Sequence, residues 1–338
     1  MNFNSLIDLE LTQYSGQTSQ SPWKFDNGSN SFNNVIIVDN IPVLLKLSQN
    51  NVNSMNLDYE IPTAIDESII DKDKLESKIK SEINRVFDLD YDLDKFYNYL
   101  KEDEKLAPSA EFCKGLRLFI ATDPFESIIA SISSSNNSIA RWTKTIDKIK
   151  KIWGDEYIFP SGRYYKFPPS EVLMEAYKNN LEEYEADNRQ MEIECYSNNL
   201  KSCGLGYRVP YVKQASEIFT LEIDLNDFYH MSYDEAYNEI IKIKGVGPKV
   251  ADCILLYGFN FREAFPSDVW IKRIVSYLYF DNDQSIPVKK IREFGMEEFG
   301  DYAGYVQLYL FHYARKSGLM DGLSKKYLLF IFFLILIH

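Results

Sequence analysis

The stretch Ile243–Asp268, IKGVGPKVADCILLYGFNFREAFPSD, contains the pattern from which the fold can be read. The two glycines of Gly245-Val246-Gly247 allow the backbone to turn sharply and to approach another molecule closely. Pro248 follows, and proline is favoured at the first position of a helix, which we expect to end at Gly258. Upstream, Ser232-Tyr233-Asp234-Glu235 is a capping box that begins another helix. The sequence therefore predicts a helix, a Gly-x-Gly hairpin and a second helix.

The backbone amides of this hairpin and of the helix after it predict a small anion site. They include N–H groups without a partner inside the helix, and they lie at the positive end of the helix dipole. A phosphate would fit there, held by Gly245, Val246 and Gly247. The hairpin carbonyls could also share a bound structural cation, whereas no cofactor is expected to be required.

Two side chains in this stretch, those of Lys249 and Asp268, could take part directly in a reaction. Lys249 falls in the first turn of the second helix, where the dipole disfavours a protonated amine, and such a lysine is a candidate nucleophile. Cys253 lies four residues later on the same face. Asp268 begins the next helix, expected from Val269 to Leu278. The alternatives are a solvated lysine and an aspartate that only caps its helix.

The combined pattern, Gly-Val-Gly-Pro-Lys-Val-Ala-Asp-Cys followed by Pro-Ser-Asp-Val-Trp-Ile-Lys-Arg, resembles the helix–hairpin–helix superfamily of DNA glycosylases. The lysine resembles that of the branch that also has lyase activity. The resemblance implies that Lys249 attacks the sugar and that Asp268 stabilises the cationic sugar. It also pairs Lys249 and Cys253 as opposite charges, which opposes the dipole effect. Trp270, an expected DNA contact, stands where the family usually has histidine.

The N-terminal sixty residues predict strands. Leu6–Leu11 alternates in part, and Asn34–Leu47 predicts a hairpin with its turn at Asp39-Asn40. Between them, Gly16-Gln17 resembles the N-terminal antiparallel domain of 8-oxoguanine DNA glycosylases. That resemblance implies that the carbonyl of Gly16 accepts a hydrogen bond from N7–H of the oxidised base. The alternative is a glycine that only makes a strand turn. The segment Thr18–Trp23 departs from the aromatic-Arg-Trp that commonly follows in the family.

Three further segments resemble the same family. Asp123-Pro124-Phe125-Glu126 predicts a helix start with a capping-box acid, and a second helix from Ile139 stops at Gly154. The SSNNSIAR between them (134–141) resembles the segment that enters the DNA gap, and Gly-Leu-Gly-Tyr-Arg resembles its partner. The local alternatives are plain helix connections with the tyrosine packed in the core. Four residues are expected to fill the gap that the flipped nucleotide leaves in the base stack and to contact the unpaired base opposite it. They are Asn136, Arg141, Tyr207 and Arg208.

The last apolar helix places Gln307 and Phe311 on one face, four residues apart. The resemblance implies that the glutamine reads the base edge, while Phe311 and Cys253 flank the base plane. For Phe311 the alternative is an ordinary core aromatic.

Composition limits the function classes. Hydrophobic residues make up 45% and charged residues 26%, as in a soluble globular protein, and 338 residues allow two or three domains. A net charge of −13 argues against a basic coat, so DNA would be gripped by backbone amides and few cations. The cysteines are scattered, without the spacing of an iron–sulfur or zinc site, and suit a reducing compartment. They are Cys113, Cys195, Cys203 and Cys253.

Two segments fall outside these patterns. Residues 178–199 are acidic and Asn-rich, which is typical of a solvated insertion. Residues 327–337, YLLFIFFLILI, are apolar but short for a bilayer, and are read as a membrane tail or a non-native C-terminus. We expect no signal peptide, no membrane partner, a monomer and an intracellular location with DNA, in cytoplasm, nucleoid or nucleus.

The predicted fold class is α+β, mostly α. A twisted antiparallel sheet domain with helices (1–122) precedes a helical glycosylase domain (123–316), and 317–338 is an apolar tail. The predicted function is a base-excision DNA glycosylase and AP lyase that flips 8-oxoguanine out of double-stranded DNA, opposite cytosine, and cuts the strand through a Lys249 Schiff base. The alternatives are a glycosylase for an alkylated purine and a non-catalytic DNA-binding module.

Overall fold

The computed structural model describes residues 1–178 and 200–319 and divides into two compact units. The first comprises Met1–Tyr91 with Arg117–Phe261, and the second comprises Asp92–Leu116 with the described part of Arg262–His338. The expected boundary at 122/123 follows the change from strands to helices, whereas the contacts join the sheet to the helices up to Phe261. Residues 179–199 of the acidic segment and the apolar stretch 327–337 lie outside the described residues.

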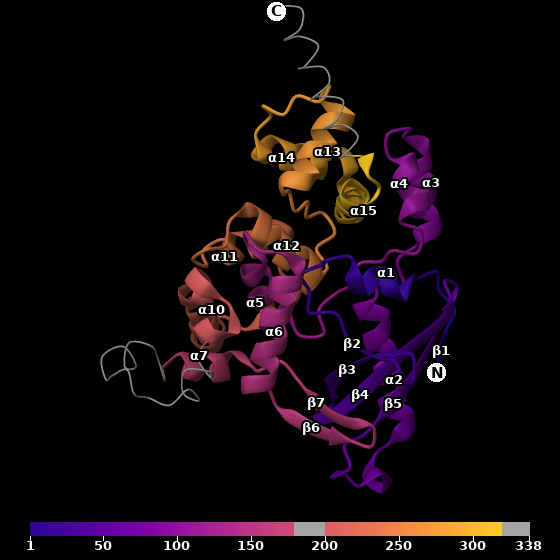
Figure 1. Cartoon of the computed structure of the whole chain (residues 1–338), viewed down its shortest axis with the longest axis vertical. Helices are drawn as coiled ribbons and strands as arrows, with labels where there is room; N and C mark the ends of the chain where they lie inside the picture. Colours follow the sequence, from indigo (N-terminus) through magenta and orange to yellow (C-terminus); the bar gives the residue numbers. More distant parts are fainter. Residues whose placement is uncertain (179–199, 320–338) are drawn as a thin grey trace, which may run out of the picture. The chain divides into compact units, whose positions relative to one another are not determined.

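The first unit opens with the expected antiparallel sheet, whose five strands lie in the order β1-β5-β4-β3-β2 (Figure 1). The β3–β4 pair confirms the predicted hairpin. Asp39 and Asn40 have φ values of 48° and 63°, as a two-residue turn that matches the strand twist requires. The strands are β1 (Asn2–Phe3), β2 (Lys24–Asp26), β3 (Ser31–Val38), β4 (Ile41–Asn51) and β5 (Ser54–Glu60).

Both faces of this sheet are covered. Helix α2 (Lys72–Val86) is capped by Asp71 and packs Leu75, Ile79 and Ile83 into the same apolar core as the strands. On a second, smaller core, Phe159 of the hairpin β6–β7 (Glu156–Phe159, Gly162–Tyr165) packs with buried strand residues. The sheet is thereby held between a helix and a hairpin.

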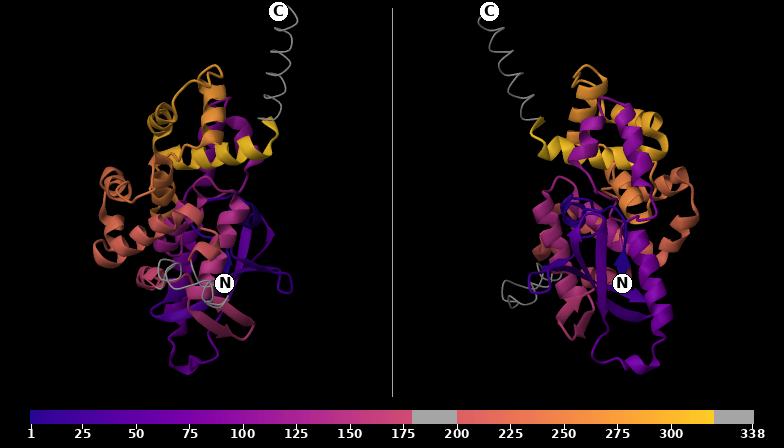
Figure 2. Two further views of the ribbon diagram at one scale, coloured as in Figure 1. Left: turned by 60° about the vertical axis from the view of Figure 1, so that its left-hand side comes forward. Right: turned by 90° about the vertical axis from the view of Figure 1, so that its right-hand side faces the viewer.

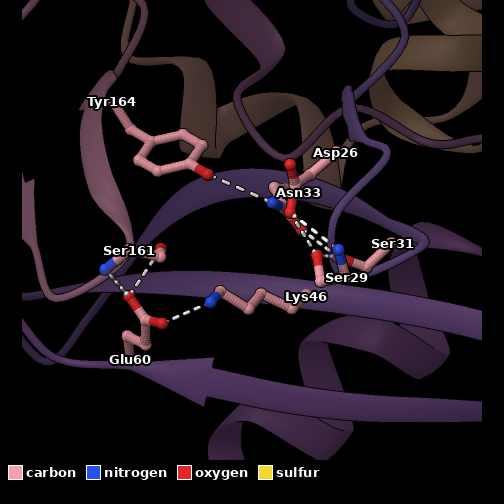
Figure 3. A network of polar contacts seen from close by, with 8 residues as sticks. All are labelled: Asp26, Ser29, Ser31, Asn33, Lys46, Glu60, Ser161 and Tyr164. Carbon is pink, nitrogen blue, oxygen red and sulfur yellow. Dashed lines mark hydrogen bonds and ion pairs between the residues drawn. The ribbon is translucent and has the colours of Figure 1, made fainter.

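Polar contacts hold the β6–β7 hairpin to the sheet (Figure 3). The Asn33 amide donates to the Tyr164 hydroxyl at 3.1 Å, and Glu60 accepts from the Ser161 hydroxyl at 2.7 Å while pairing with Lys46. Tyr164 and Ser161 are each more than a hundred residues from their partners in the sheet, so the hairpin docks by tertiary contacts.

The first unit also contains most of the helices, and two expectations at their ends need correction. Gly258 does not end its helix: it lies inside α12, which Asn260 closes in the left-handed conformation. Leu6–Leu11 is not a strand, because Asp8 caps a short helix there through the amide of Leu11. The elements are α1 (Leu9–Tyr14), η1 (Glu67–Ile69), α5 (Pro124–Ser134), α6 (Ile139–Trp153), α7 (Ser170–Lys178), η2 (Leu200–Cys203), η3 (Gly206–Arg208), α10 (Val209–Leu221), η4 (Leu225–His230), α11 (Tyr233–Ile240) and α12 (Pro248–Phe259).

The start of α5 confirms the predicted cap by Asp123 and the proline at the first position. Glu126 differs from expectation. Instead of completing a capping box, its buried carboxylate pairs with Lys150 of α6 at 2.8 Å. This pair joins the two helices on either side of 134–141.

The second unit is helical in the described residues (Figure 2). Aromatic side chains pack in its core. Phe96 packs edge-on to Tyr309 at 5.1 Å, and the Tyr309 hydroxyl donates to the carbonyl of Leu116 at 2.8 Å. Its elements are α3 (Leu93–Glu102), α4 (Ala107–Phe112), α13 (Val269–Tyr279), α14 (Val288–Phe299), η5 (Gly300–Tyr302) and α15 (Ala303–Lys316). Across residues 1–178 and 200–319, no helix has the length and apolarity that crossing a membrane needs.

Candidate active site and nucleic-acid interface

The helix–hairpin–helix forms as predicted. Ser232 and Glu235 make the reciprocal capping box of α11, and α12 begins with Pro248 after the cap residue Gly247. Gly245 has φ +84° and lies against the ring of Tyr211, while the amide of Lys244 donates to Gln214 at 2.7 Å. The hairpin is therefore fastened to α10 and presents its turn at the surface.

Helix α12 carries Lys249 and Cys253 one turn apart. Lys249 is half-buried and Cys253 is buried. Burial raises the pKa of Cys253, although the nearby Lys249 ammonium acts in the opposite direction. Burial thus favours the thiol and Lys249 favours the thiolate, and the implied pairing of opposite charges stays a prediction.

Three residues on or near this helix were not expected from the sequence. Thr18 lowers the pKa of the Cys253 thiol, and its hydroxyl lies 2.8 Å from that of Ser131 in α5. Asp252 is fully buried and accepts from the Tyr233 hydroxyl at 2.5 Å, which ties α12 to α11. Asp252 could have been recognised from the sequence, because it is a carboxylate within the apolar residues of α12 and a buried charge needs a partner.

Asp268, in the second unit, caps α13 as the local alternative stated. Its Oδ1 accepts from the amides of Trp270 and Ile271, both at 2.9 Å. Both bonds use the same oxygen, so the cap does not engage Oδ2. The aspartate also attracts the guanidinium of Arg315 in α15. The cap fixes the carboxylate and leaves one of its oxygens for other chemistry.

The second unit also contains the other predicted site residues Gln307, Phe311 and Trp270. Gln307 is buried and donates to the carbonyl of Pro266 at 2.9 Å. Phe311 is half-buried under the guanidinium of Arg315 at 4.8 Å, so it is not an ordinary core aromatic. Trp270 is half-exposed with Arg273 5.7 Å from its ring, a cation beside the position expected to contact DNA.

The segments expected to enter DNA meet in the first unit. Tyr207 is 56% exposed, so the alternative of a core tyrosine is wrong. The Asn136 amide donates to its hydroxyl at 3.4 Å, and the guanidinium of Arg208 lies 4.3 Å from its ring. Arg208 also donates to the carbonyl of Ser135 at 2.9 Å, while Arg141 is exposed in the first turn of α6.

Gly16 makes a turn directly after α1 rather than between strands, with φ +93°. The side-chain amide of Gln17 anchors this turn through both its nitrogen and its oxygen. It donates to the carbonyl of Arg117 at 2.9 Å and accepts from the amide of Phe119 at 2.8 Å. The turn is thus attached to residues 117–119, which precede α5.

Among the described residues, no cluster of three or more His, Cys, Asp or Glu is placed to hold a metal ion. The cysteines in this part of the chain, Cys113, Cys203 and Cys253, are free and buried. The cation expected at the hairpin would be held by carbonyls and stays a prediction.

The comparisons with known proteins agree with this geometry. Residues 2–128 match the 8-oxoguanine DNA glycosylase N-terminal domain, and residues 129–300 match the HhH-GPD superfamily base excision DNA repair protein. A probable N-glycosylase/DNA lyase of Methanothermobacter thermautotrophicus is 39% identical over 94% of this chain and 97% of its own length.

Solved structures give the same result. The 8-oxoguanine glycosylase/lyase of Clostridium acetobutylicum, in complex with double-stranded DNA containing cytosine opposite 8-oxoguanine, is 28% identical with a TM-score of 0.70 over 93% of this chain and 94% of that one. The 3-methyladenine DNA-glycosylase of Archaeoglobus fulgidus, 22% identical with a TM-score of 0.72 over 94% of this chain and 99% of that one, shows the same fold.

The chain therefore belongs to the HhH-GPD superfamily of base-excision DNA repair proteins, in the branch that carries the 8-oxoguanine DNA glycosylase N-terminal domain. It is a DNA N-glycosylase with an associated DNA lyase activity, and its partner is DNA.

We expect Gly245→Ala to unfold more easily and to bind duplex DNA more weakly. A Cβ there would overlap the ring of Tyr211, and φ +84° strains any residue with a side chain. The expected loss is about 1–3 kcal/mol of unfolding free energy, measured by urea titration. Gly247→Ala is the matched control for stability, because a Cβ at Gly247 meets nothing within 4 Å. Equal stability of the two variants would refute this account of the hairpin.

Proposed function

We propose that this protein excises 8-oxoguanine paired with cytosine and cleaves the strand through a Schiff base on Lys249. The observation that carries the proposal is the position of Lys249. It lies in the first turn of α12, directly behind the hairpin and one turn before the buried Cys253. A base inside a duplex is out of reach, so the damaged nucleotide must be flipped out first.

The chemistry follows from an amine nucleophile. The Nζ of Lys249 attacks C1′ of the sugar, the N-glycosidic bond breaks, and the base leaves with a proton. Opening of the sugar ring gives the Schiff base. Loss of a C2′ proton then breaks the C3′–O bond and cuts the strand on the 3′ side. The Oδ2 of Asp268 would stabilise the positive charge that develops on the sugar.

Lesion choice is assigned to one backbone carbonyl. Guanine presents an acceptor at N7, whereas 8-oxoguanine presents an N–H donor there. The Gly16 carbonyl, on the turn anchored by Gln17, would accept from the lesion and repel the normal base. Gln307 would read the Watson–Crick edge, and Phe311 and Cys253 would flank the base plane. A buried mismatch at such a contact costs roughly 1–3 kcal/mol.

DNA would be held near the site by the hairpin amides of Gly245, Val246 and Gly247, with or without a cation on their carbonyls, and by Trp270. The chain's net charge of −13 favours this kind of grip over a basic coat.

Borohydride trapping on duplexes that differ only in the lesion tests the function directly. A covalent complex with 8-oxoguanine opposite cytosine, and a weaker one opposite adenine, is the expected result. A duplex with 3-methyladenine is the informative second arm, because the same fold occurs in 3-methyladenine glycosylases. Release of that base without any trapped complex would replace the proposed substrate and mechanism. Tight binding with no base release from any duplex would indicate a module that only holds DNA.

The preference for cytosine is assigned to Arg141 and Arg208, whose planar guanidiniums suit paired acceptors. We expect Arg141→Ala to raise base release opposite adenine relative to cytosine by about tenfold, or about 1.4 kcal/mol of discrimination. Arg208→Ala should do the same and also lower stability, because it leaves the Ser135 carbonyl without this donor. Steady-state assays with each of the four opposite bases measure the ratio. Arg163→Ala, which removes an exposed arginine of β7 paired with Glu156, is the control. Unchanged discrimination in both variants would refute the assignment.

A further inference from the structure

A second tyrosine lies directly behind the exposed Tyr207. Tyr211 is half-buried in the first turn of α10, four residues after Tyr207 of η3. The two rings meet edge to face, with 6.1 Å between their centroids and 79° between their planes. Aromatic rings attract one another in this arrangement. The ring of Tyr211 is therefore a fixed support for a tyrosine that projects from the surface.

The same ring lies against the hairpin at 245–247. A Cβ on Gly245 would lie 2.2 Å from Cδ2 of Tyr211, so the glycine backbone packs directly on the ring. Three residues further along α10, the side chain of Gln214 accepts from the amide of Lys244 at 2.7 Å. The first turns of α10 thus hold the hairpin through an aromatic ring and through a hydrogen bond.

Tyr207 is held by further contacts although it is 56% exposed. The Asn136 amide donates to its hydroxyl at 3.4 Å, and the guanidinium of Arg208 lies 4.3 Å from its ring. Tyr211 adds a contact from α10 and also touches the hairpin. A continuous row of contacts therefore runs from Asn136 through both tyrosines to Gly245, all within the first unit.

The two ends of this row have different expected roles in flipping a nucleotide. Tyr207 enters the base stack and fills the gap, whereas the hairpin amides grip a backbone phosphate. Unstacking a base costs free energy, which contacts to the distorted duplex must offset. Both contacts form together only if the tyrosine and the hairpin are already the right distance apart. A fixed spacing therefore removes an ordering cost from the flipping step.

We propose that Tyr211 is a positioning residue for nucleotide flipping: its ring fixes the distance between Tyr207 and the phosphate-binding hairpin at 245–247. The inference rests on the proposed function, which assigns the stack to Tyr207 and a phosphate to the hairpin. Tyr211 itself touches neither the sugar nor the base in this account. It acts through the two elements that it holds apart.

The consequence is an unequal effect on the two activities of the enzyme. Release of a paired base requires that the base leave its partner and the stack. Cleavage at a preformed abasic site requires no unpairing, because the base is already gone. A protein without the ring of Tyr211 should therefore lose more of the first activity than of the second. A ring that only supports the hairpin would affect both activities alike.

The test uses the full chain and two duplexes of one sequence, measured in single turnovers. One contains 8-oxoguanine opposite cytosine, and the other contains a preformed abasic site opposite cytosine. We expect Tyr211→Leu, which keeps an apolar side chain and removes the ring, to slow base release by about tenfold. Cleavage at the abasic site should stay within about twofold of the unchanged protein. Tyr211→Phe keeps the ring and should leave both rates unchanged.

Three further variants separate positioning from stability. In a Tyr207→Ala background, Tyr211→Leu should slow base release no further, because the tyrosine that it positions is absent. Phe25→Leu is the matched control: it removes a half-exposed ring of β2 that packs on another ring at 4.9 Å, and should change neither rate. Gln214→Ala loosens the hairpin without touching the rings and serves if Tyr211→Leu does not fold. It should slow base release more than abasic-site cleavage.

Equal losses of both activities in Tyr211→Leu, or no loss of either, would overturn the inference. So would a loss of base release that persists in the Tyr207→Ala background, or a Tyr211→Phe protein as slow as Tyr211→Leu. Failure of the proposed function looks different, because the unchanged protein would then release no 8-oxoguanine. In that case the same variants are compared on the base that the protein does release. A greater loss there than at the abasic site supports the role of Tyr211, and an equal loss overturns it.

Discussion

The Lys249→Gln protein is expected to form no borohydride-trapped complex and to release the damaged base at least about 10³-fold more slowly, a loss of about 4 kcal/mol in transition-state stabilisation. Glutamine has no nucleophilic amine, but it is a good helix former of similar length. Duplex binding should therefore survive. Single-turnover kinetics, gel trapping and a binding titration on one lesion duplex measure all three quantities.

A matched control separates the amine from the loss of a positive charge. Lys242 is 63% exposed just beyond the end of α11, where it pairs with Glu239 at 2.7 Å. Lys242→Gln should trap and release base like the unchanged protein. Trapping that persists in Lys249→Gln would show that another amine forms the Schiff base and would remove the mechanism proposed for α12.

The Lys150→Met protein is expected to lose about 3–5 kcal/mol of unfolding free energy, because it leaves the buried carboxylate of Glu126 without its ion-pair partner. Glu126 joins α5 to α6, which flank the DNA-entering residues 134–141. Lys144→Met, on the exposed face of the same α6, should change stability by less than about 0.5 kcal/mol. Denaturant titrations of both variants measure the difference.

The loss should depend on pH in a defined direction. Burial raises the pKa of Glu126, and Asp123 adds to this, whereas Lys150 and Lys166 lower it. A carboxyl with a raised folded pKa costs stability as pH rises past its unfolded pKa, because folding then disfavours ionisation. Removing Lys150 raises that pKa further. The deficit of Lys150→Met should therefore be largest near neutral pH and should shrink in acid.

A double variant tests the cause. Glu126→Gln removes the buried charge, so Glu126→Gln/Lys150→Met should be more stable at neutral pH than Lys150→Met alone. A Lys150→Met deficit that is the same at pH 4 and pH 7, or that the second substitution does not reduce, would contradict this account.

Prediction from sequence succeeded where the signal was local. The capping box at Ser232, the proline after Gly247 and the cap at Asp123 were read correctly because each acts within one helical turn. The turn at Asp39-Asn40 was read correctly because two successive left-handed residues admit few residue types. Leu6–Leu11 was wrong for a related reason: its apolar spacing fits both a strand and a helix, and the cap at Asp8 decided for the helix.

Side-chain roles were less accessible. Glu126 occupies the position of a capping-box acid, yet a lysine on the next helix takes its carboxylate. Nothing in the local sequence shows whether Tyr207 lies in the core or at the surface. The structure places it at the surface, with 56% of the residue exposed. Asp268 was read both as a helix cap and as a catalytic carboxylate, and the cap bonds through one oxygen allow both.

The sequence by itself determined the helix–hairpin–helix, the paired strands and the candidate nucleophile Lys249, since helix starts, tight turns and periodicity depend on neighbours along the chain. The tertiary structure alone decided which distant side chains meet. Ser131 lies 113 residues from Thr18, and Arg208 lies 73 from Ser135. Serines and threonines are common and any of them can accept or donate, so no local pattern names the partner. Close packing of α5, α10 and α12 selects it, by bringing one particular hydroxyl or carbonyl within hydrogen-bond distance and excluding the water that would otherwise compete.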